Sequence, residues 1–571
     1  MRRVVLLPAL LVSMAGFVFL QDTAPRSDLA SMMPGGAMLY LEAQDLGRLL
    51  REWNASKIKA DWLGSENYAV FSRSNLLQKL EGVYSEYGAA AGFLLDLKGA
   101  IGIAGTESAL ALYGIREVEF LYISRVGQAQ LARSQLWAAR DKFEQRQAGG
   151  VSFYLRTNPA SRRTVAFAFV KGYLFLATRD DLVARALTLL AGGSDPSIAS
   201  DRWYKEAVAA APTPGELRVV MNLESLEKSV YLRSYWIHRN ASVLRQYWTA
   251  VADVTRSTAG ISESRIFLRK PEAAGQATTG SVAELVALVP PEAGLYKASS
   301  GQPASATAAL ILQKLIAAPM RYSGDWRFAP DAVSPDEHAG AETDLETRID
   351  EPPLPVDAGI SDSQALAQSM LEKAGAKAVL QLQWSVSAGG PFLRTPSVIV
   401  VAGDNPWDRA AVQAALTSAV GPLWTTSGLG AGWTPAKVGQ HSVERLEGLG
   451  TLMVAVRGPL LFLANDALLL SATLDRAGTM PSNATPVTYA AGFRHARERR
   501  NFERIMTALD SGSPVGESGF AFPRSGASAP AFFSGNLAGL SRVLSHVSEV
   551  RVIEEAEAMK VRQVVVYQTG P

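Results

Sequence analysis

The stretches that decide the fold are Arg163–Ala177, RTVAFAFVKGYLFLA, and Thr451–Ala464, TLMVAVRGPLLFLA. Each contains two apolar runs joined by a short turn with a basic residue and a glycine. This pattern predicts a β-hairpin. The two basic-glycine pairs are 286 residues apart, and an apolar helical pattern follows each hairpin. The recurrence suggests that the chain contains one structure twice.

Other segments recur in the same order along the chain. They are an opening strand at Leu39-Tyr40 and Leu295-Tyr296, a strand entering a helix at Val118–Ile123 and Ser397–Ala402, an Asn-Leu-x-x-Leu segment at Asn222–Leu226 and Asn536–Leu540, and final β runs at Arg265–Leu268 and Gln563–Tyr567. We therefore expect the α+β class, with two tandem, duplicated lobes. Each lobe should have a mainly antiparallel sheet with helices packed on one face. The alternative is two unrelated α+β domains with similar strands.

Composition places the boundaries of these lobes. The expected parts are residues 1–20 as a signal peptide or N-terminal membrane anchor, 21–27 as a linker, 28–270 as the first lobe, 271–279 as a linker, and 280–571 as the second lobe. An acidic excursion that contains prolines is expected at 331–362, inside the second lobe. Apolar residues at helical spacing predict a long helix over 67–87.

The N-terminus has the pattern of an export signal. Arg2 and Arg3 precede Val4–Leu20, an uncharged segment of seventeen residues. Small residues at Ser13 and Ala15 suit a signal peptidase, so we expect cleavage after Ala15. The alternative is a retained anchor, because seventeen residues reach the short limit for a membrane span. The expected location is the bacterial periplasm or cell envelope, with membrane contact through this segment if it is retained.

The composition excludes several classes of protein. The 571 residues contain no cysteine, which removes disulfide scaffolds, cysteine-ligated metals and thiol catalysis. Lys+Arg number 56 against 54 Asp+Glu, and this balance gives no global attraction to nucleic acid. Arg2 and Arg3 account for the whole excess. We expect no nucleic-acid partner, no cofactor and no metal.

The common catalytic motifs are missing from the sequence. The histidines at 238, 338, 441, 495 and 546 form neither H-x-x-x-H nor HExxH. Ser225–Lys228 matches S-x-x-K, but the K-T-G element that accompanies it in penicillin-recognising enzymes is missing, so we interpret the segment as the start of an amphipathic helix. The catalytic residues, if there are any, are unknown from sequence.

Two clusters are candidates for an interaction surface. Tyrosine and tryptophan suit interfaces because each has an apolar body and a polar end, and an arginine run can bind an acidic partner or anionic head groups. The alternatives are core packing for the aromatic residues and a solvated helix face with internal ion pairs for the arginines. The residues are Tyr231, Tyr235, Trp236, Tyr247 and Trp248 in the first cluster and Arg494, Arg497 and Arg500 in the second.

The opening Pro-x-x-x-x-Leu-Tyr strand and the hairpin Thr164–Thr178, which runs into Asp180-Asp181-Leu182, support a family resemblance. The chain resembles a class of exported bacterial proteins defined as a domain of unknown function. The likeness covers most of residues 28–270 and, more weakly, 280–571. It rests on packing motifs, so it implies a bacterial envelope setting and carries over no activity and no catalytic residue.

The function expected from sequence is an exported, non-catalytic binding or assembly protein of the bacterial cell envelope. Its partner is an unknown protein or envelope component. One alternative is a periplasmic hydrolase whose site is assembled from distant residues. The other is a membrane-tethered scaffold that keeps its N-terminal segment.

Overall fold

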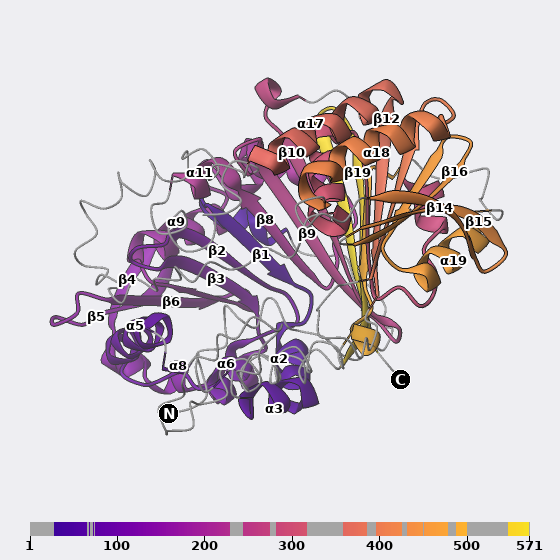
Figure 1. Ribbon diagram of the computed structural model, residues 1–571. Coiled ribbons are helices and arrows are strands. Elements are labelled where there is room, and N and C mark those ends of the chain that lie inside the picture. The colour runs from indigo at the N-terminus through magenta and orange to yellow at the C-terminus, as the bar shows by residue number, and fades with distance from the viewer. Residues whose placement is uncertain are drawn as a thin grey trace. The chain divides into compact units, whose positions relative to one another are not determined.

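The protein is described from a computed structural model of the full chain (Figure 1). The structure describes residues 28–65, 68, 72–73, 75–228, 244–274, 281–316, 358–384, 396–424, 431–448, 450–477, 487–498 and 546–569. The chain divides into two compact units. Unit 1 comprises Met1–Thr278 with Ala491–Pro571, and unit 2 comprises Thr279–Ala490.

Unit 1 contains both helices and strands. They are η1 (Leu29–Met32), β1 (Leu39–Ala43), α2 (Leu46–Ala55), α3 (Lys57–Leu63), α5 (Asn75–Ala91), α6 (Leu97–Ile103), β2 (Ser108–Gly114), β3 (Glu119–Arg125), α7 (Gln128–Ala132), α8 (Gln135–Ala138), η2 (Arg140–Lys142), β4 (Glu144–Ala148), β5 (Val151–Thr157), β6 (Thr164–Val170), β7 (Tyr173–Ala177), α9 (Asp180–Leu190), η3 (Ile198–Ser200), α10 (Arg202–Ala210), β8 (Leu217–Asn222), α11 (Leu223–Glu227), β9 (Tyr247–Ser257), β10 (Gly260–Arg269), η5 (Pro271–Ala273), β19 (Val547–Ala556) and β20 (Lys560–Thr569).

Unit 2 has a similar succession of elements. They are α14 (Ala283–Ala287), β11 (Leu295–Ser300), α15 (Ala304–Ile311), the π-helix η6 (Leu312–Ile316), α17 (Ala358–Lys373), β12 (Ala376–Gln383), β13 (Ser397–Gly403), α18 (Arg409–Trp424), β14 (Gly432–Val438), β15 (His441–Glu447), β16 (Thr451–Arg457), β17 (Leu460–Ala464), α19 (Ala467–Arg476) and β18 (Tyr489–Phe493), which begins at the end of the unit.

The strands of the two units pair in the same order. In unit 1 the antiparallel row β1-β2-β3-β7-β6-β5-β4 continues on the other side of β1 through β8. In unit 2 the antiparallel row is β11-β12-β13-β17-β16-β15-β14, and β18 pairs with the other side of β11. The predicted α+β class with a mainly antiparallel sheet is therefore confirmed.

Helices cover both faces of each sheet, which corrects the expectation of helices on one face. In unit 1, α9 and α10 bury Leu182 and Ala207 against one face, while α5 and α7 bury Ala90 and Leu131 against the other. Figure 1 shows α9 and α5 on opposite sides of β6. In unit 2, α14 and α19 contribute to one apolar cluster and α15, α17 and α18 to the other.

The central strands explain why both faces need cover. All seven residues of β13 are buried, and β6 and β17 are also continuous apolar runs. Strands of this kind are buried on both faces, whereas a strand with one wet face alternates apolar and polar residues. Burial of each large apolar side chain contributes roughly 1.5–3 kcal/mol, so this central layer is a major source of stability.

Both predicted central hairpins are confirmed, but their turns differ by one residue. Val170 pairs with Tyr173, so the turn residues are Lys171, at φ 52°, and Gly172, at φ 82°. Arg457 pairs with Leu460. The second turn is therefore formed by Gly458 and Pro459, and the basic residue that sequence placed in the turn ends the strand instead.

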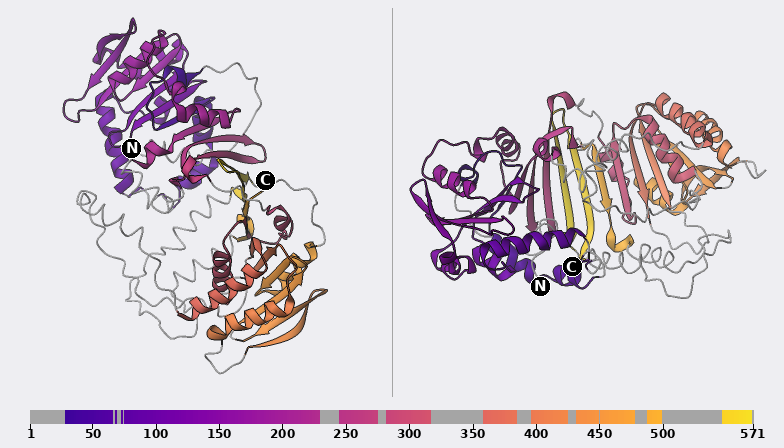
Figure 2. Two further views of the ribbon diagram at one scale, coloured as in Figure 1. Left: turned by 90° about the horizontal axis from the view of Figure 1, so that it is seen from above. Right: turned by 90° about the vertical axis from the view of Figure 1, so that its left-hand side faces the viewer.

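The C-terminal hairpin β19–β20 belongs to unit 1, although the predicted second lobe extended to residue 571. β20 lies beside β10 (Figure 2). The two strands pair antiparallel, with Leu268 opposite Lys560. The two final β runs that sequence assigned to separate lobes therefore lie side by side. Sequence could not show this, because nothing in either strand's composition identifies its partner.

The hairpins β9–β10 and β19–β20 have the same internal register. Each has a β-bulge that leaves one residue out of the pairing, Trp248 in the first and Ser548 in the second, which are 300 positions apart. The regular pairs also match at this separation, since Ile261 faces Arg256 and Val561 faces Ala556. Bulges are kept as specific features of a strand pair, so the match extends beyond composition.

Other expected segments are only partly described. The helix expected at 67–87 is observed as α5, and residues 358–362 of the acidic excursion begin α17. The signal segment 1–20, the linker 21–27, and residues 275–279 and 331–357 lie outside the described residues. Within the described ranges, no helix is long and apolar enough to cross a membrane.

A buried ion pair connects β8 to β9. Arg218 donates from Nε and Nη2 to the two carboxylate oxygens of Asp253, both at 2.8 Å, and the side chains are 4% and 8% exposed. Nη2 also donates to the carbonyl of Ala211, and the Gly215 amide donates to Asp253. Each charge is compensated by the other, so removing one leaves the other buried without its partner.

We expect Asp253→Ala to lower the free energy of unfolding by about 3–5 kcal/mol, because it leaves the Arg218 guanidinium buried without its counter-ion. Urea unfolding followed by far-ultraviolet circular dichroism measures this change. Arg202→Ala is the control, since its ion pair with Glu206 is exposed and should contribute little. Equal stability of Asp253→Ala and this control would contradict the assignment.

Candidate functional site

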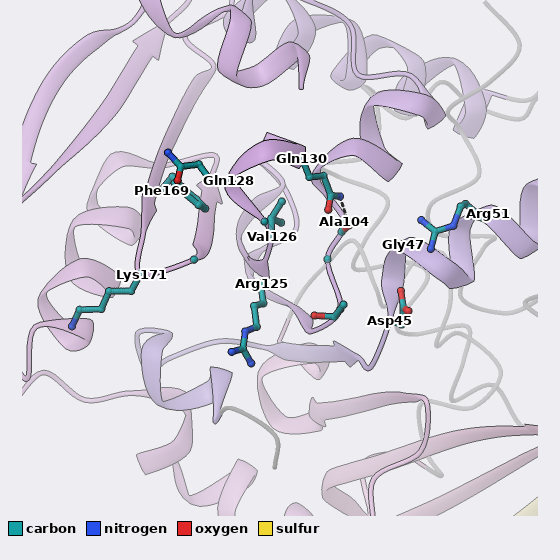
Figure 3. Close-up of a pocket in the computed structure, with 14 residues that line it drawn as sticks. Asp45, Gly47, Arg51, Ala104, Arg125, Val126, Gln128, Gln130, Phe169 and Lys171 are labelled. Carbon is teal, nitrogen blue, oxygen red and sulfur yellow. Dashed lines mark hydrogen bonds between the residues drawn. The ribbon is translucent and has the colours of Figure 1, made fainter. Parts of the chain in front are cut away.

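A polar pocket in unit 1 is the candidate site (Figure 3). Its volume is about 710 Å³, which is in the range of small-molecule sites. Its wall is formed by the start of α2, the segment after α6, the end of β3 with the start of α7, and the β6–β7 turn. The lining residues are Asp45, Gly47, Arg51, Ala104, Gly105, Thr106, Arg125, Val126, Gly127, Gln128, Gln130, Phe169, Lys171 and Gly172.

The lining is rich in basic and backbone groups. Arg51, Arg125 and Lys171 come from three separate elements (Figure 3). Asp45 is the one acidic residue among those that line the pocket, so the formal charge of the lining is positive. The Asp45 carboxylate accepts from the Arg48 amide at 2.7 Å and thereby caps α2. Its role is thus explained by the helix.

Glycine at position 47 brings α2 close to the rest of the wall. A Cβ atom at Gly47 would lie 3.1 Å from the Ala104 carbonyl oxygen and 3.3 Å from Nη1 of Arg51. The absence of a side chain therefore lets the start of α2 approach the end of α6. It also leaves room for the Arg51 guanidinium to lie along the first turn of its own helix.

Two apolar clusters and an ion-pair network fix α2. Leu49 packs with strand residues of β1 and β8, and Leu50 packs with α6. On the polar side, Arg256 on β9 is 4% exposed and pairs with Glu52 at 2.8 Å and with Glu216. Arg48 pairs with the same two carboxylates. The helix that carries Arg51 is thus tied to the sheet by charge as well as by packing.

Arg125 is held at the end of β3 by its backbone. Its amide donates to the Glu107 carbonyl at 2.8 Å, and a Cβ at Gly105 would lie 1.8 Å from the Arg125 carbonyl oxygen. Glycine is therefore required where the two segments meet. The Arg125 side chain is 56% exposed, and its guanidinium lies 3.7 Å from Glu107, so one face of that group stays open to solvent.

Lys171 lies in a strained backbone conformation. Its φ of 52° is in the left-handed region, where glycine or asparagine is favoured and other residues cost roughly 1–2 kcal/mol. Its neighbour Gly172 accepts from the Val126 amide at 3.0 Å, which joins the turn to the end of β3. A strained residue at the rim of a pocket is a reason to look for function.

The ionisable side chains of the lining are two arginines, one lysine and one aspartate. The lining contains no histidine, and its one carboxylate caps a helix. Among the described residues, no group of three histidine or carboxylate side chains could hold a metal ion. A carboxyl with a raised pKa lies elsewhere in unit 1: burial raises the pKa of Glu554. It accepts from Gln563 at 3.3 Å.

The described histidines are engaged in side-chain contacts. His441 lies between Nη2 of Arg457 and Oδ1 of Asp475, each at 2.7 Å. Because guanidinium can only donate, Nδ1 of His441 accepts and Nε2 carries the proton. His546 contacts Asp61 at 2.7 Å, and the buried His495 lies against Phe493. His238 and His338 lie outside the described residues.

Of the residues predicted as an interaction surface, those that the structure describes do not line the pocket. Tyr247 is buried in an apolar cluster, and Trp248 has the Arg202 guanidinium 4.8 Å from its ring centre. Arg494 pairs with Glu549 at 3.4 Å. The remaining predicted residues Tyr231, Tyr235, Trp236 and Arg500 lie outside the described residues, while Arg497 lies within them and its amide donates to the Arg494 carbonyl. An interface through these clusters stays a prediction.

Sequence reasoning missed the pocket residues. Arg51, Arg125 and Lys171 are spread over 120 positions and share no motif. Lys171 was part of the predicted hairpin pattern. In that pattern a basic residue beside glycine indicates a turn and does not indicate a ligand site. The pocket exists because α2, β3 and the β6–β7 turn meet in space.

Comparisons with known proteins give little further information. No protein-family model matches the chain, and no curated protein matches it. Two crystal structures of a protein named TP0453, crystal forms III and I, are similar at 11% and 10% identity, with TM-scores of 0.25 and 0.24. Each alignment covers 43% of this chain, and 81% and 80% of those chains.

We expect Arg256→Met to loosen α2, because Glu52 and Glu216 then lose the buried cation between them. Amide hydrogen exchange within Leu46–Ala55 should become faster, while exchange in β6 should not change. Arg202→Met removes a surface ion pair of the same type and serves as the control. Unchanged exchange of α2 in Arg256→Met would show that Arg256 is not needed to position this helix.

Proposed function

We propose that the protein is an exported, non-catalytic binding protein of the bacterial cell envelope and that the unit 1 pocket is its ligand site. The observation that carries the proposal is the composition of the pocket wall. Cationic side chains and glycine backbone from four segments surround a volume of about 710 Å³, and no acid–base or nucleophile–base pair lines it.

Duplication is part of the same proposal. A single ancestral lobe copied in tandem accounts for the common strand order β1-β2-β3-β7-β6-β5-β4 and β11-β12-β13-β17-β16-β15-β14. It also accounts for the bulges at Trp248 and Ser548. Two copies allow one to keep structural duties while the other acquires a ligand site.

The location is proposed from the N-terminal sequence. Arg2 and Arg3 before an uncharged run support export, and small residues at Ser13 and Ala15 support cleavage. The acceptors and donors of the pocket also suit a small polar ligand from the aqueous periplasm. The alternatives remain a periplasmic hydrolase and a membrane-tethered scaffold.

Edman sequencing of the protein isolated from its own cells tests the location. We expect the mature chain to begin near Gly16 and to be released with the periplasmic fraction. A chain that begins at Met1 and stays with the membranes would contradict cleavage and favour the tethered scaffold. A variant with Arg2 and Arg3 both changed to Glu should stay in the cytoplasm, since the basic region directs export.

Gly127→Trp tests the pocket without assuming the charge of the ligand. Gly127 has φ −65°, which any residue adopts, and a Cβ there would meet no atom within 4 Å. The indole should therefore occupy the pocket without straining the fold. Native mass spectrometry of protein isolated from the periplasm should detect a bound small molecule on the wild type and none on this variant.

Gly127→Ser, which is small and caps a helix well, is the matched control and should retain the bound mass. A wild-type protein that carries no ligand from its native compartment and binds nothing from a periplasmic small-molecule extract would contradict the binding proposal. Covalent labelling of the wild type by a serine-directed fluorophosphonate probe would favour the hydrolase instead.

A further inference from the structure

The two units differ in charge and in side-chain filling in the region that forms the pocket in unit 1. Register identifies equivalent residues without reference to sequence similarity. Arg125 faces Tyr173, the first residue of β7, and Ala402 faces Leu460, the first residue of β17. The next amide donates to the second turn residue in both units: Val126 to Gly172 at 3.0 Å and Gly403 to Pro459 at 2.8 Å. Ala402 is therefore the counterpart of Arg125.

The same register makes Gly458 the counterpart of Lys171. Both are the first turn residue, and their φ angles are 55° and 52°. The helix that follows the first strand also differs in charge between the units. In unit 2, α15 has no charged residue, whereas α2 in unit 1 carries Arg51. Arg125 and Lys171 thus correspond in unit 2 to the uncharged residues Ala402 and Gly458, and the helix in the place of α2 has no charged residue over Ala304–Ile311.

Unit 2 also fills this place with a side chain. Trp407 is 6% exposed, its amide donates to the Gly458 carbonyl at 3.0 Å, and its Nε1 donates to the Pro459 carbonyl at 2.8 Å. In unit 1 the residues after β3 include Gly127, where a Cβ would meet no atom within 4 Å. Trp407 thus donates to both turn carbonyls of unit 2, with its amide to Gly458 and with its indole to Pro459.

Backbone strain separates the two turns as well. Unit 2 has glycine at the left-handed first position, where glycine carries no steric cost. Unit 1 has Lys171 at the same conformation and bears that cost. Among the described residues, no carboxylate forms an ion pair with Lys171 or with Arg51. A lysine that adds strain, in the copy whose pocket is open, points to a charged ligand.

We infer that the pocket of unit 1 binds an organic oxyanion, one molecule per chain, and that unit 2 has no equivalent site. This inference rests on the proposed function of that pocket and adds the class of ligand. Guanidinium and ammonium groups form charge-assisted hydrogen bonds with carboxylate or phosphate oxygens. The pocket is several times larger than a bare inorganic ion, and Phe169 gives it an apolar wall for the carbon part of a ligand.

Isothermal titration calorimetry of the full chain at low salt tests the inference with three probes: glucose 6-phosphate, citrate and glucose. We expect one equivalent of glucose 6-phosphate or citrate to bind, and the probe that binds identifies phosphate or carboxylate as the preferred group. Glucose should not bind. Affinity should fall as salt is raised, because the three basic side chains are accessible to solvent.

Lys171→Asn is the decisive variant. Asparagine tolerates the left-handed backbone, so the fold should be kept or slightly stabilised while the charge is lost. We expect at least a tenfold loss of affinity, and a similar loss for Arg51→Gln. Arg162→Asn is the matched control: Arg162 is also an exposed basic residue at positive φ, 56°, in the turn at the opposite end of β6. Its affinity should equal that of the wild type.

Unchanged affinity in Lys171→Asn, two equivalents of anion per chain, or binding of neither anion would overturn the inference. These outcomes can be separated from failure of the proposed function. A neutral ligand found by native mass spectrometry and lost in Gly127→Trp would leave the binding function standing and remove the oxyanion assignment. If no ligand of any charge is found, the binding function fails first.

Discussion

Burial of the central strands on both faces is the constraint on which this structure depends. β6 and β7 in unit 1, and β13 and β17 in unit 2, are apolar along nearly their whole length. Backbone groups in such strands must pair with neighbours, and their side chains must be covered on two sides. The antiparallel order and the two helical layers follow from this need. The pocket then forms at one end of the layer, where a strand end, a hairpin turn and a helix start meet.

The comparison of the two units shows how one fold can carry different local chemistry. Side chains at a strand end and a turn can change without loss of the central packing, because they lie outside it. Lys171 and Gly458 occupy the same backbone conformation, and Arg125 and Ala402 the same register position. In unit 2, Trp407 fills the region that corresponds to the open pocket of unit 1. Unit 2 has its own polar contact at another place, where His441 contacts Arg457 and Asp475 beside α19.

The outer strands of the two sheets resist further pairing in different ways. β4 has charged and amide side chains that are mostly exposed, and Pro435 and Lys437 lie in β14. Charge and proline are the usual means by which an edge strand avoids pairing with another chain. On the other side of unit 1, the pairing of β20 with β10 extends the sheet by two strands from the C-terminus. The last segment of the chain thus becomes part of the unit formed by the first.

Sequence by itself determined the fold class, the two central hairpins and the repetition of elements, since these follow from local apolar pattern and turn residues. From the N-terminal segment, sequence also predicts export. It did not determine that helices cover both faces, although the unbroken apolar run of β13 carried that information. Only the tertiary structure decided that β20 pairs with β10 and that Arg51, Arg125 and Lys171 line one pocket. Pairing partners and pockets depend on contacts between residues far apart in the chain, and local pattern does not specify them.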